Sequence, residues 1–482
     1  MTMKLARAPV DERENIPVTD GQREMTRTLL SIAQSWRYTE SSVNPTADLL
    51  AWVERRNAET AVEIHKISLD ECAPWFYDSA EGCIRNQTRS FFTVTGLRGE
   101  GFMQPVIVQN EIGYLGILCK EIDGVMHFLL QAKIEPGNVN CVQISPTIQA
   151  TKSNFTRKHG GKRPPYLDYF LNAARYEIVA DQIQSEQSSR FYKKRNRNIM
   201  IRVEEDVPVL PSFRWMTLGQ IKTLMRYDNL VNMDTRTVLS CIPFSRLRLT
   251  PDEREELSAL FTDEPLFRSV FEDSPGNPLP TVYQYINNAK MFTEDRLQFV
   301  PLDRLENWEL RGGEFVCKEP YPFKVVFCDI AIQGREVRRW TQPLFEATGV
   351  ATFGLVCCEE NGVLEFLVRA APEVGCFDVL ELGPTVQQEA VAGRQRQDTV
   401  TRFFWDKLRT GEGVMFDHLL SEEGGRFYHE QNRNVLLRVG RNELPALPEG
   451  YFLLNYRTLN RLVEINNTLN IQLRNLLSLL EG

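Results

Sequence analysis

The chain has 482 residues, more than one ordinary domain needs, so we expect two to four domains. Hydrophobic residues make up 42% and charged residues 25%, a balance typical of globular proteins with enough apolar material for a core. The net charge of −8 disfavours general binding to nucleic acid or to anionic membranes, but it permits a small anionic ligand held by a few arginines.

The N-terminus, MTMKLARAPVDERENIPV, has no apolar segment of the signal-peptide type, and no apolar run is long enough to span a bilayer. The ten cysteines are scattered and form no CxxC pair. We therefore expect reduced, mostly buried thiols, not disulfides or metal ligands. Together these features predict a cytoplasmic protein.

Residues 1–66 are expected to form an N-terminal helical extension, because ADLLAWVERRNAE has the spacing of an amphipathic helix. Residues 67–244 are interpreted as a first module. Its apolar runs YLGILCK and VMHFLLQAKI flank the turn signal EIDG, which predicts a β-hairpin. A further strand (CVQISPTIQ), an aromatic helix (YLDYFLNAA) and another strand (NIMIRV) are expected before one long amphipathic helix closes the module.

A polar block in this module, SEQSSRFYKKRNRN at 185–198, recurs near the end of the chain as SEEGGRFYHEQNRN at 421–434. The two copies are identical at eight of fourteen positions. Two more segments recur in the same order and at nearly the same interval, 104–149 as 342–387 and 226–240 as 464–478. We interpret the chain as a tandem duplication in which each copy is a domain with its own core.

Residues 245–298 are acidic and contain Pro and Gly punctuation, so we expect a linker with a short helix. Residues 299–482 form the second module, in which TFGLVCC and VLEFLVRAA flank the turn EENG. Strands and helices mix in both modules without strict βαβ alternation. The predicted fold class is therefore α+β, with a mixed sheet flanked by helices in each module.

Several cofactor motifs are missing from the sequence. No GxGxxG follows a strand, which argues against nicotinamide or flavin binding. The HGGK at 159–162 lacks the first glycine and the Ser or Thr of a phosphate-binding loop. No HExxH or paired Cys/His spacing indicates zinc. We expect no cofactor and no metal, so ordinary side chains must supply any chemistry.

Long motifs in both modules carry a resemblance to one family. In the first module they are QAKIEPGN, SPTIQATKSNFTRKHGGK, SEQSSRFYKKRNRN and VNMDTRTVLS, and in the second they are REVRRWTQPL, ELGPTVQ and SEEGGRFYHEQNRN. On these residues the chain resembles the NDP-hexose 2,3-dehydratases, which act on dTDP-4-keto-6-deoxyglucose in making the deoxysugars of antibiotics. The resemblance extends over nearly all of the chain.

This resemblance implies two Nudix-like modules per subunit and a homodimer. The Nudix hydrolase motif itself is missing, since SEEGGRF places two adjacent acids before glycines instead of carboxylates at helical spacing. Metal-dependent diphosphate hydrolysis is therefore not expected. At the end of the second block the family is expected to have an aromatic residue, and this chain has Asn434.

The implied reaction removes the carbon 3 proton, which is alpha to the ketone, and then the carbon 2 hydroxyl, which is beta to it. The enol product tautomerises to an unstable 3,4-diketo sugar, so an NADPH-dependent ketoreductase is the expected functional partner. Such a site needs a base, an acid for the departing hydroxyl and donors aimed at the enolate oxygen. The nucleotide needs arginines for its phosphates and an aromatic face for its base.

The polar blocks and their surroundings supply these residue types. We predict four catalytic candidates, His159, Lys152, Glu135 and Tyr192. The predicted substrate-binding residues are Gln149, Thr151, Asn154, Arg190, Arg195, Arg197, Trp340, Gln387, Arg426, Tyr428 and Arg433. The loop ATKSNFTRKHGGKRPP occurs in this form only in the first module, which favours that module as the working one.

Other interpretations stay open. Each block could be a structural turn with a buried ion pair, from Arg190 to Glu186 or from Arg426 to Glu422. The duplication could also give two ligand pockets, one of them vestigial. The chain could be an epimerase or a non-catalytic nucleotide-sugar protein on a Nudix-like scaffold. A weaker alternative is a nucleoside-diphosphate hydrolase, which would depend on a metal.

Overall fold

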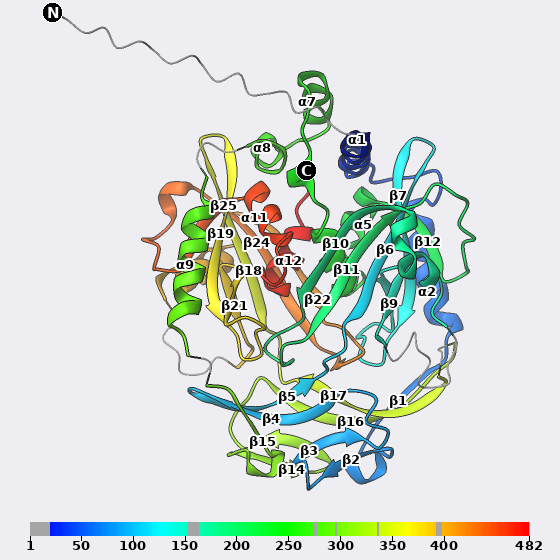
Figure 1. The fold of residues 1–482 in the computed structure, drawn as a ribbon, viewed down its shortest axis with the longest axis vertical. Helices are drawn as coiled ribbons and strands as arrows, with labels where there is room; N and C mark the ends of the chain where they lie inside the picture. Colours follow the sequence, from blue (N-terminus) through cyan, green and yellow to red (C-terminus); the bar gives the residue numbers. More distant parts are fainter. Residues whose placement is uncertain are drawn as a thin grey trace, which may run out of the picture.

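The protein is described here from a computed structural model that covers residues 20–152, 163–273, 277–294, 296–334, 337–391 and 398–481. The strands of these residues form two large and two small sheets (Figure 1). Both large sheets contain parallel and antiparallel pairs and pack against helices, so the α+β class with mixed sheets is confirmed.

The two large sheets have the same strand arrangement. The first has the order β10 (Glu177–Ser185), β11 (Arg195–Arg202), β6 (Gly113–Ile122), β7 (Val125–Ile134) and β12 (Phe213–Thr217), with β8 (Val142–Ser145) on β7 and β9 (Ile148–Ala150) on β6. The second has the order β22 (Val414–Ser421), β24 (Gln431–Val439), β18 (Thr352–Glu360), β19 (Val363–Pro372) and β25 (Tyr451–Asn455), with β20 (Leu380–Gly383) on β19 and β21 (Val386–Gln388) on β18. In each sheet one parallel pair, β11 with β6 or β24 with β18, joins otherwise antiparallel strands.

Both predicted hairpins are confirmed as β6–β7 and β18–β19. Asp123 and Gly124 have positive φ angles of 51° and 79°, and Asn361 and Gly362 have 52° and 73°. A two-residue turn with positive φ at both positions matches the twist of the flanking strands, and Asp-Gly and Asn-Gly adopt it most readily. The turn residues therefore fix the register of both hairpins.

The two small sheets exchange strands between the halves of the chain. β1 (Val62–Ile67) lies in the N-terminal extension but pairs with β16 (Phe323–Ile332) of the second half. β13 (Gln298–Val300) lies in the connector but pairs with β4 (Thr93–Gly99) of the first half. The remaining strands are β2 (Trp75–Asp78), β3 (Cys83–Asn86) and β5 (Phe102–Val108) in the sheet of β4, and β14 (Trp308–Arg311), β15 (Glu314–Cys317), β17 (Arg339–Ala347) and β23 (Phe427–Tyr428) in the sheet of β16.

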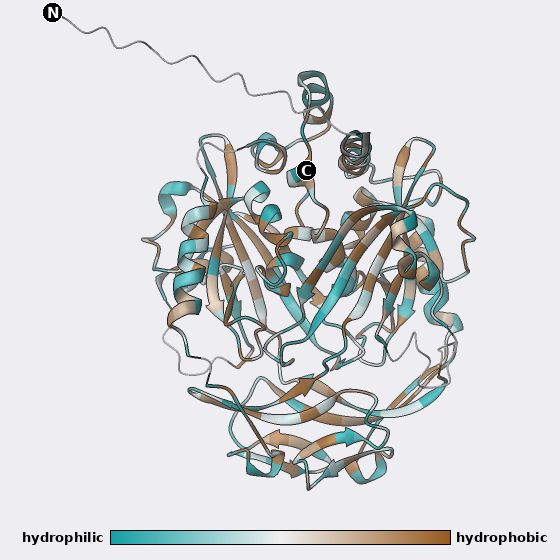
Figure 2. Ribbon diagram, in the orientation of Figure 1, coloured by the Kyte–Doolittle hydropathy of each residue, from teal (hydrophilic) through white to brown (hydrophobic). Residues whose placement is uncertain are grey.

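One apolar core extends across both halves. Its members include Ile144 and Met200 of the first large sheet and Phe366 and Leu436 of the second. Each half also has its own smaller cluster on the outer face of its large sheet. Figure 2 shows the brown, hydrophobic strands of the two large sheets on either side of the central helices. The expectation of a separate core for each copy is therefore wrong for the largest cluster, because the helices between the sheets are buried against both of them.

Short helices end each half where one long helix was predicted. These are α5 (Leu218–Leu224) and α6 (Met233–Ser240), then α11 (Tyr456–Val463) and α12 (Ile471–Ser478). Asn232 and Asn470 interrupt the pattern, because their side chains cap new helices by accepting hydrogen bonds from the Thr235 and Leu473 N–H groups. Outside these pairs and the connector, the helices of the described residues are α1 (Asp20–Ser35), α2 (Thr46–Glu59), α4 (Leu167–Leu171) and α10 (Thr399–Thr410).

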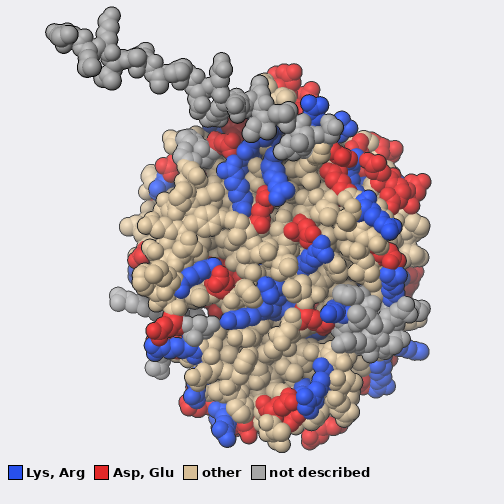
Figure 3. Space-filling model, in the orientation of Figure 1, with Lys and Arg blue, Asp and Glu red and all other residues tan. Residues whose placement is uncertain are grey.

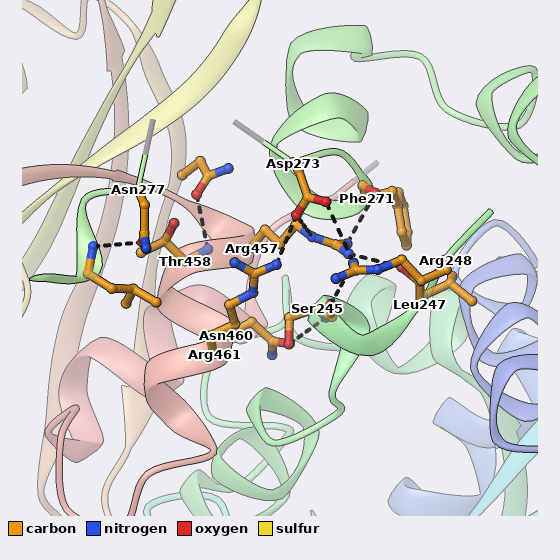
Figure 4. Close-up of polar contacts among 12 residues, drawn as sticks. Ser245, Leu247, Arg248, Phe271, Asp273, Asn277, Arg457, Thr458, Asn460 and Arg461 are labelled. Atoms are coloured by element: carbon orange, nitrogen blue, oxygen red, sulfur yellow. Dashed lines mark hydrogen bonds and ion pairs between the residues drawn. The ribbon is translucent and has the colours of Figure 1, made fainter. Parts of the chain in front are cut away.

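The connector carries three helices instead of the single short one predicted, α7 (Pro251–Ser258), α8 (Glu264–Phe271) and α9 (Leu279–Phe292). Arg457 of α11 fastens it to the second half (Figure 4). This buried guanidinium donates to the Asp273 carboxylate at 2.9 Å and to the carbonyls of Phe271 and Leu247 at 3.1 Å each. The Arg457 side chain thus holds two parts of the connector, the carbonyl of Leu247 before α7 and the segment Phe271–Asp273 at the end of α8.

On the face drawn in Figure 3, basic and acidic side chains are interspersed. This surface has no broad basic field of the kind that binds nucleic acid. Within the described ranges, no helix is both long and apolar enough to cross a membrane.

A threonine holds the two strands of each hairpin together, and its removal tests this role. The Thr147 hydroxyl accepts from the Leu118 N–H at 2.9 Å and donates to the Leu129 carbonyl; Thr385 makes the same pair of contacts to Val356 and Leu367. Valine has nearly the same shape but would leave a buried N–H and a buried C=O unpaired. We expect Thr147→Val to lower the free energy of unfolding by about 1–3 kcal/mol in urea titrations.

Thr147→Ser is the matched control, because it keeps the hydroxyl and loses only a methyl group. If the valine variant is as stable as the serine variant, the hydroxyl does not bridge these strands.

Candidate active site

A cavity of about 630 Å³ lies where the first large sheet meets the small sheets. This volume is typical of sites for small molecules. Its lining combines aromatic rings, carboxyl groups and cations from both halves of the chain. The lining residues include Trp75, Phe92, Tyr114, Lys133, Glu135, Gln149, Thr151, Glu186, Lys194, Asn196, Asp234, Trp340, Glu423 and Arg426.

The second polar block reaches this cavity through a backbone crossing. The Gly137 N–H donates to the Gly424 carbonyl at 2.7 Å, and the His429 N–H donates to the Gly137 carbonyl at 2.8 Å. A Cβ atom on Gly137 would lie 1.5 Å from the Phe427 carbonyl oxygen, so only glycine allows this approach.

The crossing is reciprocal. The Gly375 N–H donates to the Ser188 carbonyl of the first block at 2.8 Å, and the Lys193 N–H donates to the Gly375 carbonyl at 2.8 Å. Each copy of the block therefore packs against the segment that follows the hairpin of the opposite half, at Gly137 or at Gly375. This placement gives the repeated sequence its structural role.

Two carboxyl groups from different halves meet in the cavity. Glu135 follows β7, and Glu423 belongs to the second block. Gln149 Nε2 donates to Glu135 Oε2 at 3.1 Å and to Glu423 Oε1 at 3.3 Å. Lys133 Nζ lies 3.1 Å from Glu135 Oε1. Burial and the neighbouring Glu135 carboxyl raise the pKa of Glu423 to about 8, so Glu423 is protonated at neutral pH.

Two further carboxyl groups lie nearby. Asp234 is 1% exposed, and among the described residues neither of its oxygens has a hydrogen-bond partner. Burial, with the charge of Glu186, raises its pKa well above the ordinary value. Glu186 accepts from Asn196 Nδ2 at 2.6 Å, and burial raises its pKa as well. Burial therefore disfavours the ionised form of both carboxyl groups.

The cations of the cavity are only partly neutralised. Burial lowers the pKa of Lys194 to about 8, and its ammonium donates to the Glu111 carbonyl. Arg426 stacks its guanidinium 4.3 Å from the centre of the Phe92 ring and donates to Gln109 Oε1 at 3.3 Å. Among the described residues Arg426 forms no ion pair and its Nε has no partner, so this guanidinium can receive an anion.

Of the predicted site residues, the structure brings five together at this cavity. They are Glu135, Gln149, Thr151, Trp340 and Arg426. Trp340 is oriented by a hydrogen bond from its Nε1 to Gln342 Oε1 at 3.0 Å.

Several predicted residues lie outside the lining. Arg197 and Arg433 form two-point ion pairs with Asp181 and Asp417 across neighbouring strands. Tyr192 packs on Phe299 and Tyr428 stacks on His429, while Arg195 lies 3.8 Å from the centre of the Phe377 ring. All five residues are therefore engaged in contacts within the protein, and their positions do not support a role in binding substrate at this cavity.

Three predicted residues remain from the segment that follows β9 in the sequence. Lys152 is exposed and is not part of the cavity lining. Asn154 and His159 lie outside the described residues.

The corresponding region of the second half is filled by its own side chains. Arg190, the counterpart of Arg426, is 2% exposed and holds Glu389 through two contacts of 3.0 and 3.1 Å. Glu430 lies 3.8 Å away, and Gln387 accepts from Asn470 Nδ2 at 2.9 Å. A ligand anion at Arg190 would have to displace Glu389.

The alternative of an ion pair from Arg190 to Glu186 is wrong. Arg190 forms its ion pair with Glu389, and Glu186 accepts a hydrogen bond from Asn196. Glu422 likewise accepts from Asn432 Nδ2 at 2.6 Å, and Arg426 forms no ion pair with it in the described chain. Asn434, where an aromatic residue was expected, is buried and donates to the Asn432 carbonyl at 2.9 Å, as Asn198 does to Asn196 at 3.2 Å.

The cavity residues that sequence reasoning missed include the charged Lys133, Lys194, Asp234 and Glu423. The signal that could have found them is the difference between the two copies. Glu423 aligns with Gln187 in the polar block, Lys194 aligns with Glu430, and Lys133 aligns with Ala371 in the hairpin. The two copies thus keep the same scaffold but differ in charge at these positions.

Across the described ranges, no three His, Cys, Asp or Glu side chains are grouped so that they could hold a metal ion. The cavity lining offers acid–base groups, aromatic faces and, among the residues that the structure describes, a guanidinium without an ion-pair partner.

A family model described as NDP-hexose 2,3-dehydratase matches residues 46–242 and 279–480. Three relatives share the name dTDP-4-dehydro-6-deoxy-alpha-D-glucopyranose 2,3-dehydratase. The protein of Saccharopolyspora spinosa is 39% identical over 451 residues, covering 91% of this chain and 92% of the relative. That of Streptomyces violaceoruber is 36% identical, covering 90% and 97%, and that of Amycolatopsis orientalis is 32% identical, covering 93% and 92%.

The match covers most of the chain, and the fold and cavity include both matched segments. The chain is an enzyme of the dehydratase class, and it belongs to the NDP-hexose 2,3-dehydratase family.

Buried carboxyl groups should make stability fall as the pH rises. Burial raises the pKa of Glu422 to about 8, so its contribution is complete below the unfolded-state pKa of about 4.5 and is lost as the pH rises to about 8. Glu422→Gln removes this titration. We expect its unfolding free energy, relative to the natural protein, to increase between pH 5 and 8 by up to about 1.4 kcal/mol per pH unit.

Urea titrations at several pH values measure this difference, and exposed Glu63→Gln is the control. A Glu422→Gln effect that stays constant from pH 5 to 8 would contradict a protonated Glu422.

Proposed function

We propose that this chain removes water from dTDP-4-keto-6-deoxy-D-glucose across carbons 2 and 3, as a hydro-lyase that gives the 3,4-diketo-2,6-dideoxy sugar. The names of the relatives support this substrate. The observation that carries the proposal is one cavity that combines a carboxyl pair, Glu135 and Glu423, with the guanidinium of Arg426, which has no ion-pair partner within the described ranges.

The reaction makes limited demands on a protein. The ketone at carbon 4 acidifies the proton at carbon 3, and the enolate then expels the beta hydroxyl at carbon 2. No electrons leave or enter the substrate overall, so acid–base groups suffice and a redox cofactor is not required. Positioned acids and bases typically accelerate such proton transfers about a hundred- to ten-thousandfold.

The rest of the cavity suits the nucleotide. Arg426 is fixed on Phe92 and can offer two N–H groups to a diphosphate. Trp75 and Trp340 provide aromatic faces for thymine. We assign the diphosphate to Arg426 and the sugar to the carboxyl pair. His159 stays a predicted acid–base residue of the segment that follows β9, whereas Lys152 and Tyr192 have no reacting role in this proposal.

The two equivalent arginines give a matched test of nucleotide binding. Arg426→Gln should weaken dTDP binding about ten- to a hundredfold in calorimetric titrations, because a charged hydrogen bond contributes about 1.5–3 kcal/mol. Arg190→Gln should leave dTDP affinity unchanged and lower the melting temperature, because Glu389 and Glu430 would lose their cation. Equal losses of dTDP affinity in both variants would refute the assignment.

The reaction itself is tested in deuterium oxide with an NADPH-dependent ketoreductase to trap the unstable diketone. We expect the recovered sugar to lack the carbon 2 hydroxyl and to carry deuterium at carbon 2, because tautomerisation of the enol reprotonates that carbon. The reaction should proceed in EDTA without added nicotinamide or flavin before the trapping step.

Other outcomes identify the alternatives. An epimerase would return a 4-keto sugar labelled at carbon 3 or 5 with its carbon 2 hydroxyl intact, and a binding protein would return unlabelled substrate. Activity lost on chelation and restored by Mg²⁺ would favour a hydrolase.

We further propose that the protein is a cytoplasmic homodimer of Nudix-like modules that supplies a ketoreductase in the deoxysugar branch of antibiotic biosynthesis. The instability of a 3,4-diketo sugar supports this coupling, because a reductase must consume it promptly. The internal repeats and the shared strand order of the large sheets support the modular interpretation.

A further inference from the structure

The carboxyl pair of Glu135 and Glu423 in the cavity has no equivalent pair at the corresponding positions of the second half, Glu373 and Gln187. Glu135 and Glu423 are hydrogen-bonded to each other and share the side-chain amide of Gln149. In the second half, Glu373 occupies the position of Glu135, but the residue opposite it is Gln187. Glu373 binds Asn470 Nδ2 at 2.7 Å. The second half therefore has one carboxyl group where the first has two.

The surroundings of the two carboxyl groups are unequal. Lys133 Nζ lies 3.1 Å from Glu135 and favours its ionised form, whereas the second half has Ala371 at this position. Glu423 accepts from the Gly425 N–H at 2.9 Å and forms no ion pair among the described residues. Two carboxyl groups in contact cannot both ionise readily, so the pair holds one proton. The contacts place the negative charge on Glu135 and the proton on Glu423.

The stereochemistry of the sugar matches such a pair. In a D-gluco ring the carbon 3 hydrogen and the carbon 2 hydroxyl lie on the same face. A base and an acid that remove them must therefore approach from one side. Neighbouring carboxyl groups held by one glutamine meet this requirement.

We propose that Glu135 is the base that removes the carbon 3 proton and that Glu423 is the acid that protonates the departing carbon 2 hydroxyl. The assignment rests on the proposed function. The C3–H electrons form the enolate, which then forms the C2=C3 bond and breaks the C2–O bond, and the oxygen leaves as water with the proton of Glu423. Glu135 then carries a proton and Glu423 a charge. Direct transfer across their hydrogen bond restores the starting state.

Substitution of each carboxyl group separates the two roles. In deuterium oxide, Glu423→Gln should lower water loss about a hundred- to ten-thousandfold while the recovered substrate still gains deuterium at carbon 3. Glu135→Gln should abolish both the exchange and the water loss. Glu373→Gln, the counterpart in the other half, should behave like the natural protein. Retained dTDP affinity and circular dichroism establish that the variants fold.

The outcomes are distinct. Water loss at the natural rate in Glu423→Gln, or equal loss of exchange and elimination in that variant, would overturn the acid assignment. Failure of the natural protein to dehydrate the sugar would instead refute the proposed function.

A measurement without substrate tests the shared proton directly. Infrared difference spectra between pH 6 and pH 9 should show protonated carboxyl absorption that titrates near pH 8, and Glu423→Gln should remove the share of Glu423 from it while the share of Glu422 stays. An unchanged band in that variant would place the proton elsewhere and overturn the pair.

Discussion

The contact between the Gly137 backbone and the second polar block determines what the cavity can contain. It brings a segment from the end of the chain against the first hairpin, and no side chain fits between them. Glu423 and Arg426 enter the cavity only because of this crossing. The exchanged strands β1 and β13 and the shared core reinforce it, because each ties one half of the chain to the other. The site is thus a property of the whole chain.

The same scaffold carries two different charge patterns. Thr151 and Arg426 both line the cavity, whereas Glu389, the counterpart of Thr151, binds Arg190 and neutralises it. The ion pairs with Glu389 and Glu430 satisfy a guanidinium whose burial without an anion would be strongly unfavourable. The second half therefore gains internal charge balance where the first half keeps an open cation. A ligand phosphate can take in the first half the place that a carboxylate holds in the second.

The sequence predicted local structure well where neighbouring residues decide it. The Asp123–Gly124 and Asn361–Gly362 turns fixed two hairpins, and the aromatic segment YLDYFLNAA contains helix α4. It predicted partners poorly, because nothing in the pattern of β1 indicates that it pairs with β16. For the site, Glu135, Gln149 and Arg426 were found by residue type and repeat position. Arg197 and Arg433 have the same chemistry, but the neighbouring strand places Asp181 and Asp417 opposite them.

The crossing also explains why the cavity contains an acid at neutral pH. Glu135, Glu186, Glu423 and Asp234 all lie in its wall, and the cations near them are Lys133, Lys194 and Arg426. An unpaired buried carboxylate is several kcal/mol less favourable than its neutral form. Lys133 supports one ionised carboxyl group on Glu135, so the carboxyl group that the second block adds retains its proton. The same burial that disfavours the charge of Glu423 makes it a proton donor. Its acidity is thus set by where the second half of the chain inserts it, next to an ionised neighbour and out of water.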